Sequence, residues 1–217
     1  MPIKKSQVED IGRPAPAWMT SYSDLVTQLL TFFIMLFALS AATTEDQLKK
    51  IKQKIDNYVT ENNLEKFVST KITLKEGLVL TFSEKYMFDS GKADIYQEAK
   101  EVIKNIAQLL VDEPNRISIE GHTDNTPIST IEFPSNWELS TTRATKLLRY
   151  LLEELKFDPK RLTAAGFGEW HPVVPNDTIE NRAKNRRVDI IVRRMDLDEI
   201  RVWRQKLSAA AKSVINQ

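Results

Sequence analysis

The sequence contains no cysteine, only two histidines and almost no net charge. Without cysteine the chain has no disulfide, no thiolate metal site and no lipid anchored on cysteine. His122 and His171 are too few for a metal centre unless carboxylates help, so no metal site is expected. The 31 basic residues nearly balance the 30 acidic ones, and a formal charge of +1 gives no reason to expect nucleic acid as a partner.

Sequence motifs for covalent chemistry are also missing. We find no nucleophile elbow, phosphate-binding loop or metalloprotease helix, and no internal repeat or low-complexity tract. We therefore expect a protein that is not an enzyme and holds no resident cofactor. The 217 residues suit one ordinary globular domain with additional segments.

One strongly apolar run stands out from this hydrophilic background. It reads WMTSYSDLVTQLLTFFIMLFALSAA and carries no charge from Leu25 to Ala42. Because about 20 helical residues span a hydrocarbon core of roughly 30 Å, we predict a transmembrane helix over residues 18–42 after a polar tail, residues 1–17. A cleaved signal peptide is the alternative, although the run starts late and no small-x-small cleavage site follows it. Lysines or arginines lie on both sides, so charge alone does not fix the orientation.

Asp24 is the one charged residue of this run, and polar residues follow it on one helical face. Thr27, Gln28 and Thr31 lie three, four and seven positions later. A charged side chain at bilayer depth costs about 2.5–3.5 kcal/mol on insertion scales, so such an acid usually faces a partner or a water-filled path. The plain alternative is an interfacial acid near the helix N-terminus, because Asp24 lies only about 9 Å along the helix from Trp18.

The remainder of the chain is predicted as a linker, a folded domain and a closing helix. Residues 43–69 contain an amphipathic helical pattern, which fits a solvated spacer or a helix that lies on the membrane or blocks a pore. Residues 70–195 alternate short strands with amphipathic helices, which predicts an α/β fold with helices on one side of a sheet. Residues 196–217 fit a C-terminal helix. Trp170 and Trp203 are expected to be packing residues.

Polar residues of the domain gather where a strand ends and a helix starts. Asp124 follows the strand RISIE and its terminal Gly121, and Arg143 lies near the start of the next predicted helix. A carboxylate and a guanidinium in one pocket would suit a zwitterionic ligand, since each can pair with one end of it. An ordinary structural salt bridge is the alternative. His122 is expected to be a loop or core residue.

The apolar segment resembles the membrane helix of the MotB family, the B subunits of bacterial flagellar stators. The resemblance is carried by the tryptophan, the tyrosine and small residue before the aspartate, and the FF pair after it. Ser23, Thr27, Gln28 and Thr31 could supply oxygens along an ion path or instead satisfy partner helices, while the resemblance implies that Asp24 carries the translocated ion. It also implies a cytoplasmic N-terminus and a plug in the linker. We expect H⁺ rather than Na⁺ as the ion.

The domain is similar to the OmpA-like peptidoglycan-binding family, an α+β sandwich of βαβαβ type. MFDSGKADI, GHTD, LSTTRA and NRRVDI occur in the family's order, although the loop at residues 126–135 is longer than in short members. The resemblance implies that Asp124 and Arg143 hold the diamino acid of the peptide stem. Pocket neighbours would be Thr123, Asn136, Leu139 and, more weakly, Arg187.

Together the two resemblances predict a single-pass inner-membrane protein whose C-terminal domain faces the cell wall. They imply a homodimer inside a pentamer of MotA-like A subunits, which act on the flagellar rotor while the domain holds peptidoglycan. Two alternatives stay open. One is a stator-like subunit of a non-flagellar ion-driven complex, and the other is a passive membrane-anchored tether.

Overall fold

The computed structural model describes residues 16–195 and 199–203, and within them the side chains other than those of residues 39–46. The chain divides into two compact units, residues 1–45 and 46–217, which we describe separately. The predicted closing helix falls mostly outside the described residues, of which 199–203 are helical.

Helix α1, Ala17–Glu61, runs through the end of the first unit and into the second. Its stretch Ala17–Ala38 is long and apolar enough to cross a membrane. None of that stretch is buried within the chain, so its large apolar side chains are left for lipid or for partner helices to cover. The predicted membrane helix and linker helix are thus parts of one continuous helix.

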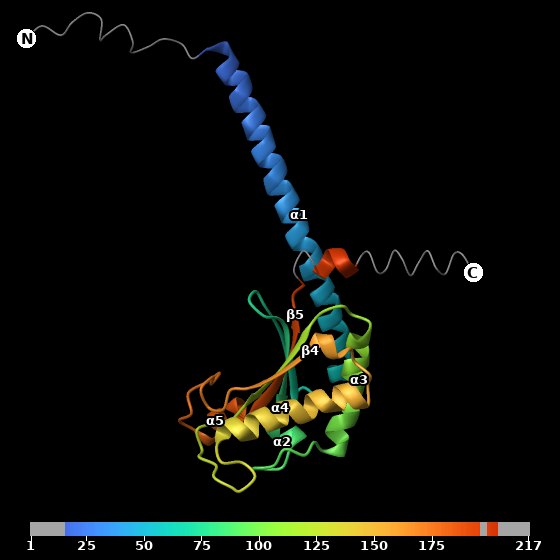
Figure 1. Cartoon of the computed structure of the whole chain (residues 1–217), viewed down its shortest axis with the longest axis vertical. Coiled ribbons are helices and arrows are strands. Elements are labelled where there is room, and N and C mark those ends of the chain that lie inside the picture. Colours follow the sequence, from blue (N-terminus) through green and yellow to red (C-terminus); the bar gives the residue numbers. More distant parts are fainter. Residues whose placement is uncertain (1–15, 196–198, 204–217) are drawn as a thin grey trace, which may run out of the picture. The chain divides into compact units, whose positions relative to one another are not determined.

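The second unit contains a five-stranded sheet of mixed direction (Figure 1). Its strands are β1 (Val68–Thr73), β2 (Gly77–Ser83), β3 (Ile117–His122), β4 (Leu162–Gly166) and β5 (Arg187–Arg193), arranged in the order β1-β2-β5-β3-β4. Only β3 and β4 pair in parallel, and α4 connects them. The hairpin β1–β2 turns just before Gly77, where φ is +107°, a value that favours glycine.

The main core lies on one face of this sheet. Alternate residues of the strands point into it, among them Leu80, Ile119 and Ile190. The apolar sides of α3 (Gln97–Val111) and α4 (Asn136–Glu153) close the core. Both helices were expected from their apolar spacing. The short helices α2 (Glu84–Met87) and α5 (Ile179–Asn185) and the turn η2 (Pro159–Arg161) were not expected from the sequence.

The last four turns of α1 belong to the same core. Leu48, Ile51, Ile55 and Val59 are between 0% and 6% exposed and join the cluster of the sheet and helices. Polar contacts flank them, since Asp56 accepts a hydrogen bond from Thr70 of β1. The amphipathic pattern predicted for the linker therefore covers the domain's own sheet in this structure.

Candidate functional site

The start of α4 packs directly against the ends of β3 and β4. A Cβ on Gly121 would lie 2.2 Å from the carbonyl oxygen of Ser140, and a Cβ on Gly166 would lie 2.2 Å from Thr141 Oγ1. Only glycine leaves room for this approach. It brings the loop after β3, which carries Asp124, next to the helix that carries Arg143.

Asp124 is 4% exposed and both of its carboxylate oxygens are used. Oδ1 accepts the backbone N–H of Thr126 at 3.0 Å, and Oδ2 accepts a guanidinium N–H of Arg186 at 2.6 Å. The backbone of the loop is held too, because Asn136 Nδ2 donates to the carbonyl oxygens of Asp124 (3.3 Å) and Thr126 (3.0 Å). The loop after β3 is therefore set before any ligand arrives.

Arg143 is almost fully buried, with 2% of its surface exposed, so little of its side chain is accessible to a ligand. Its Nε donates to the carbonyl oxygen of Lys92 at 2.8 Å and its Nη2 to that of Asp89 at 3.2 Å. Its Nη1 lies 2.6 Å from Glu84 Oε1, and its guanidinium stands 4.9 Å from the Phe88 ring centre. Burial lowers the pKa of Arg143, and the neighbouring Glu84 carboxylate opposes that effect.

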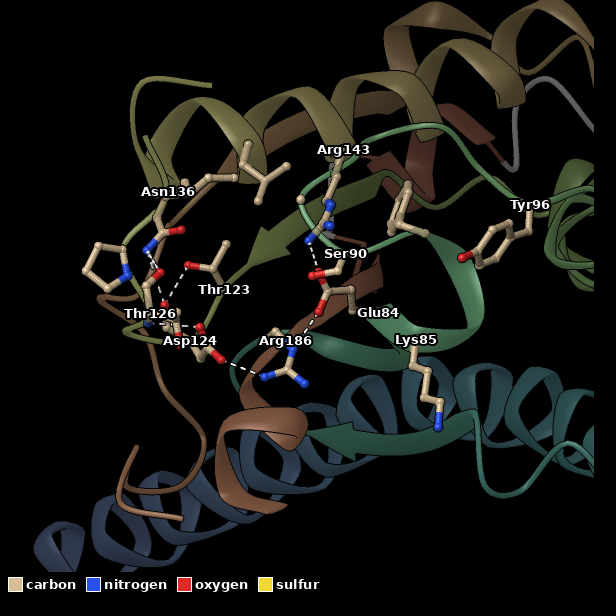
Figure 2. A pocket seen from close by; sticks show the side chains of 15 residues that line it. Glu84, Lys85, Ser90, Tyr96, Thr123, Asp124, Thr126, Asn136, Arg143 and Arg186 are labelled. Atoms are coloured by element: carbon tan, nitrogen blue, oxygen red, sulfur yellow. Dashed lines mark hydrogen bonds and ion pairs between the residues drawn. The ribbon is translucent and has the colours of Figure 1, made fainter. Parts of the chain in front are cut away.

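Glu84 connects the two arginines, as Figure 2 shows. Its second oxygen, Oε2, lies 2.6 Å from Arg186 Nε, and Arg186 in turn pairs with Asp124. Although burial opposes it, the contacts with Asp124 and Glu84 raise the pKa of Arg186. The four groups thus form an alternating row, Arg143–Glu84–Arg186–Asp124, whose formal charges cancel.

This row lines a cavity of about 610 Å³. Three of the predicted neighbours, Thr123, Asn136 and Leu139, also line it. The long loop predicted at residues 126–135 supplies part of the wall through Thr126, Pro127 and Ile128. Leu139 packs with Ala93 and Phe133 in a small separate apolar cluster under that loop. The remaining lining residues include Lys85, Ser90, Gly91 and Tyr96.

Two sequence expectations change at this site. Asp124 and Arg143 share the cavity but form no direct ion pair within the described residues, because Arg186 and Glu84 stand between them. Arg187 does not line the cavity, since it begins β5 and its Nε donates to Asp189 Oδ2 at 2.9 Å. The neighbouring Arg186 takes the predicted place. The NRRVDI motif signalled this region, but only the structure shows that Arg186, the C-cap residue of α5, lines the cavity and that Arg187, the first residue of β5, does not.

His122 is a buried residue, as expected, and lies beside Arg187 rather than in the cavity. Its ring stacks on Phe167, and within the described residues neither ring nitrogen has a hydrogen-bond partner. Burial, with a further contribution from Arg187, lowers its pKa to about 4. No group of three potential metal ligands occurs among the described residues. Trp170 differs from its prediction, because it is 66% exposed instead of packed.

The apolar part of α1 carries the second candidate site. Thr27 Oγ1 donates to the carbonyl oxygen of Ser23 at 2.8 Å, and Thr31 Oγ1 donates to that of Gln28 at 2.9 Å. Both hydroxyl hydrogens are thus satisfied within the helix, while the oxygens can still accept. Asp24 has no side-chain hydrogen bond within the described part of the chain and is exposed in the single chain.

Known families match both halves of the chain. Residues 3–58 match the family described as membrane MotB of the proton-channel complex MotA/MotB, and residues 87–186 match the OmpA family. Among relatives, the uncharacterised protein YtxE of Bacillus subtilis is 32% identical, over 84% of this chain and 90% of its own length. Motility protein B of Bacillus subtilis is 43% identical, over 70% of this chain and 58% of its own length. Motility protein B of Helicobacter pylori strain J99 is 30% identical, over 80% of this chain and 84% of its own length.

Solved structures agree with this assignment. A MotB-like protein of Desulfovibrio vulgaris superposes with a TM-score of 0.62 at 29% identity, covering 70% of this chain and 96% of that one. The cell wall anchor of the type VI secretion system of Pseudomonas aeruginosa gives 0.59 at 30%, covering 66% and 99%. The periplasmic domain of Helicobacter pylori MotB gives 0.54 at 25%, covering 69% and 93%. The five-stranded domain, the apolar helix ahead of it and these likenesses lead to one conclusion: the chain belongs to the MotB family.

Proposed function

We propose that this chain is the B subunit of an ion-driven flagellar stator, which couples cation flow across the inner membrane to torque and anchors the complex to peptidoglycan. The observation that carries the proposal is the lone acid of the membrane segment. Within Ala17–Ala38, Asp24 is the only residue with an ionisable carboxylate, and membership of the MotB family supplies the context.

Asp24 is the ion-carrying group in this proposal. A carboxylate that faces a partner helix or a narrow water path loses solvation, which favours its protonated form and allows it to bind and release a proton. Ser23, Thr27, Gln28 and Thr31 line the path. Because the Thr27 and Thr31 hydroxyls already donate to their own helix, they offer only acceptor oxygens to a passing cation.

The test of this role is Asp24→Asn, with Asp24→Glu as the matched variant that keeps the charge. We expect the asparagine variant to reach the membrane and bind walls but to abolish motility. Motility equal to that of the wild type would contradict the ion-carrying role of Asp24 and favour a passive membrane-anchored tether. The translocated ion is H⁺ in this proposal, so a protonophore should stop motility while removal of the sodium gradient should not. The opposite pattern would assign Na⁺.

The cavity at the end of the sheet is the proposed peptidoglycan site, with the diamino acid of the peptide stem as ligand. Asp124 would accept from the ammonium group, and the guanidinium row would pair with the carboxylate. Arg186 is 34% exposed at its side chain and Arg143 is 2% exposed, so Arg186 is the readier contact and Arg143 positions Glu84 and the loop of Asp89. A zwitterion suits this row because it adds a carboxylate and an ammonium together, which keeps the site neutral.

Sacculus pull-down tests the site. Asp124→Ala and Arg186→Gln should lose binding of the full chain in detergent, while Arg149→Gln, an exposed arginine on the same helix as Arg143, should bind like the wild type. Arg143→Ala should lose binding as well, together with some stability, because it leaves Glu84 with one partner fewer. Wild-type binding by both Asp124→Ala and Arg186→Gln would remove the cavity from the proposal.

The remaining roles follow from the family. Two copies of this chain would sit inside a pentamer of MotA-like A subunits, which turn against the rotor, with the N-terminus in the cytoplasm and the domain facing the wall. Co-purification of the full chain with an A subunit, and the mass of that complex, check the partner and the stoichiometry. A complex of different composition would correct the proposed stoichiometry and leave the roles of Asp24 and the cavity unchanged.

A second candidate is a wall anchor of a non-flagellar envelope complex. The likeness to the type VI secretion anchor supports it, because that protein is matched over 99% of its length. A chromosomal neighbour that encodes a MotA-like protein with four membrane helices would favour the stator, and a motility defect on deletion of the gene would decide for it. Normal motility after deletion would favour the alternative.

A further inference from the structure

A second cavity, which shares Arg186 with the cavity of the proposed peptidoglycan site, opens on the other face of the sheet. It has a volume of about 470 Å³. Lys71 of β1 and Thr81 of β2 lie on the sheet face opposite Leu80 and the main core. Residues from the turn before β1, from α5 and from the loop before α5 complete the wall, and the lining comprises Glu65, Lys66, Phe67, Val68, Ser69, Lys71, Thr81, Ser83, Val173, Ala183, Lys184, Arg186 and Arg187. We call it the basic cavity.

The rim of the basic cavity carries uncompensated positive charge. Lys66, Lys71 and Lys184 come from three separate segments and are exposed, and none has an ion pair within the described residues. The cavity includes a single acid, Glu65. Three ammonium groups that surround one hollow repel each other weakly in water, and an anion bound between them would relieve that repulsion.

Two serines of the lining supply hydroxyl donors. Ser69 and Ser83 make no side-chain hydrogen bond within the described part of the chain, although Ser83 stands at the N-cap of α2. The neighbouring Thr81 and Arg187 are held in place, because Thr81 Oγ1 donates to Asp189 Oδ1 at 2.6 Å and Arg187 Nε donates to Asp189 Oδ2 at 2.9 Å. Free hydroxyl donors and ammonium groups in one lining form a donor set that suits phosphate oxygens.

We propose that the basic cavity binds the phosphodiester backbone of an anionic cell-wall polymer, which gives the domain a second attachment besides the peptide stem. The hollow is large enough for a phosphate with its adjoining sugar or polyol unit. A polymer is favoured over a small anion because the lysines come from three segments around an open cavity, which suits successive phosphates. The choice of a wall polymer rests on the proposed function, which holds the domain against the wall.

The test uses the full chain in detergent and a triple variant, Lys66→Gln, Lys71→Gln and Lys184→Gln. All three side chains are exposed, so the variant should fold, which far-ultraviolet circular dichroism checks. The matched control changes three exposed lysines elsewhere to glutamine: Lys75, Lys104 and Lys160. The probe is a purified phosphodiester-linked polyol polymer. We expect the triple variant to bind it at least tenfold more weakly than the wild type, and the control to stay within about twofold.

Two further measurements separate this site from the peptidoglycan site. Walls stripped of phosphodiester polymers with hydrofluoric acid keep their peptide stems, so the triple variant should bind them like the wild type, whereas Asp124→Ala should not. Anionic phospholipid vesicles should compete poorly with the polymer. The proposal is overturned if the triple variant binds the polymer like the wild type, or if vesicles displace the polymer completely. If Asp124→Ala binds stripped walls like the wild type while the triple variant still binds the polymer weakly, the peptidoglycan site is overturned and the basic cavity stands.

Discussion

The docking of the last turns of α1 onto the sheet leads to a prediction that bears directly on the plug. Ile55 is fully buried at 0% exposure, and its change to alanine leaves a cavity between α1 and the sheet. Substitutions of buried isoleucine by alanine typically cost about 2–5 kcal/mol. We therefore expect Ile55→Ala to lower the free energy of unfolding of the domain by about 2–5 kcal/mol.

The same reasoning gives the free energy that holds the whole segment. Burying Leu48, Ile51, Ile55 and Val59 contributes on the order of 6–12 kcal/mol at about 1.5–3 kcal/mol each, as an upper bound. This is a gross gain, which the conformational entropy of ordering the segment partly offsets, whereas the roughly 5–15 kcal/mol of a whole domain is a net value. We expect the folded domain to keep this helix docked, because a net docking free energy of about 2.8 kcal/mol already holds a 99:1 population. Deleting residues 45–60 to test a plug would then unfold the domain as well.

Two assays check this prediction. Urea unfolding of the full chain in detergent, followed by circular dichroism, compares Ile55→Ala with the control Asn57→Ala, which changes an exposed neighbour. In cells, the absence of native cysteine allows a clean cross-link, Asp56→Cys with Thr70→Cys, because these side chains touch. The cross-link should form in the membrane-anchored protein, while the pair Asn57→Cys with Thr70→Cys should not cross-link. A loss below about 0.5 kcal/mol for Ile55→Ala, or an unformed cross-link, would refute the docking and restore a mobile plug.

Three further predictions concern the domain. His122 has a folded pKa of about 4 against 6.5 in the unfolded chain, so the unfolded state binds more protons between these values. The free energy of unfolding should therefore fall by up to about 3 kcal/mol as the pH drops through this window. In His122→Gln, the free energy of unfolding measured from pH 7 to 4 should depend less on pH than in the wild type. An equal pH dependence would contradict the lowered pKa of His122. Gly121→Ala should lower the free energy of unfolding by about 2 kcal/mol or more and weaken sacculus binding, because the added methyl group meets the Ser140 carbonyl. Thermal melting and wall pull-down measure both effects, and wild-type values in both would contradict this close packing. Asn185→Ala removes the amide oxygen that accepts hydrogen bonds from the N–H groups of Val173 and Val174, so proteases should cleave that loop faster. Cleavage at the wild-type rate would show that Asn185 does not hold the loop.

Periodicity predicted the regular elements well, because each of them has an apolar side that must be buried. The alternation of strands and helices expected over residues 70–195 is present, and α3 and β5 are among its regular elements. The short elements α2 and α5 went unpredicted, since four and seven residues carry too little periodic signal. Yet α2 supplies Glu84, which contacts both arginines of the site.

The sequence by itself determined that the chain has one membrane-competent segment with one acid in it, and that its domain has the blocks of an OmpA-like fold in order. Both properties depend on composition and local spacing. Only the tertiary structure decided which arginine enters the pocket, that Glu84 separates Arg143 from Asp124's partner Arg186, and that the amphipathic linker completes the core. These outcomes depend on which side a strand residue faces and on contacts between segments far apart in the chain, and a linear pattern does not specify either of them.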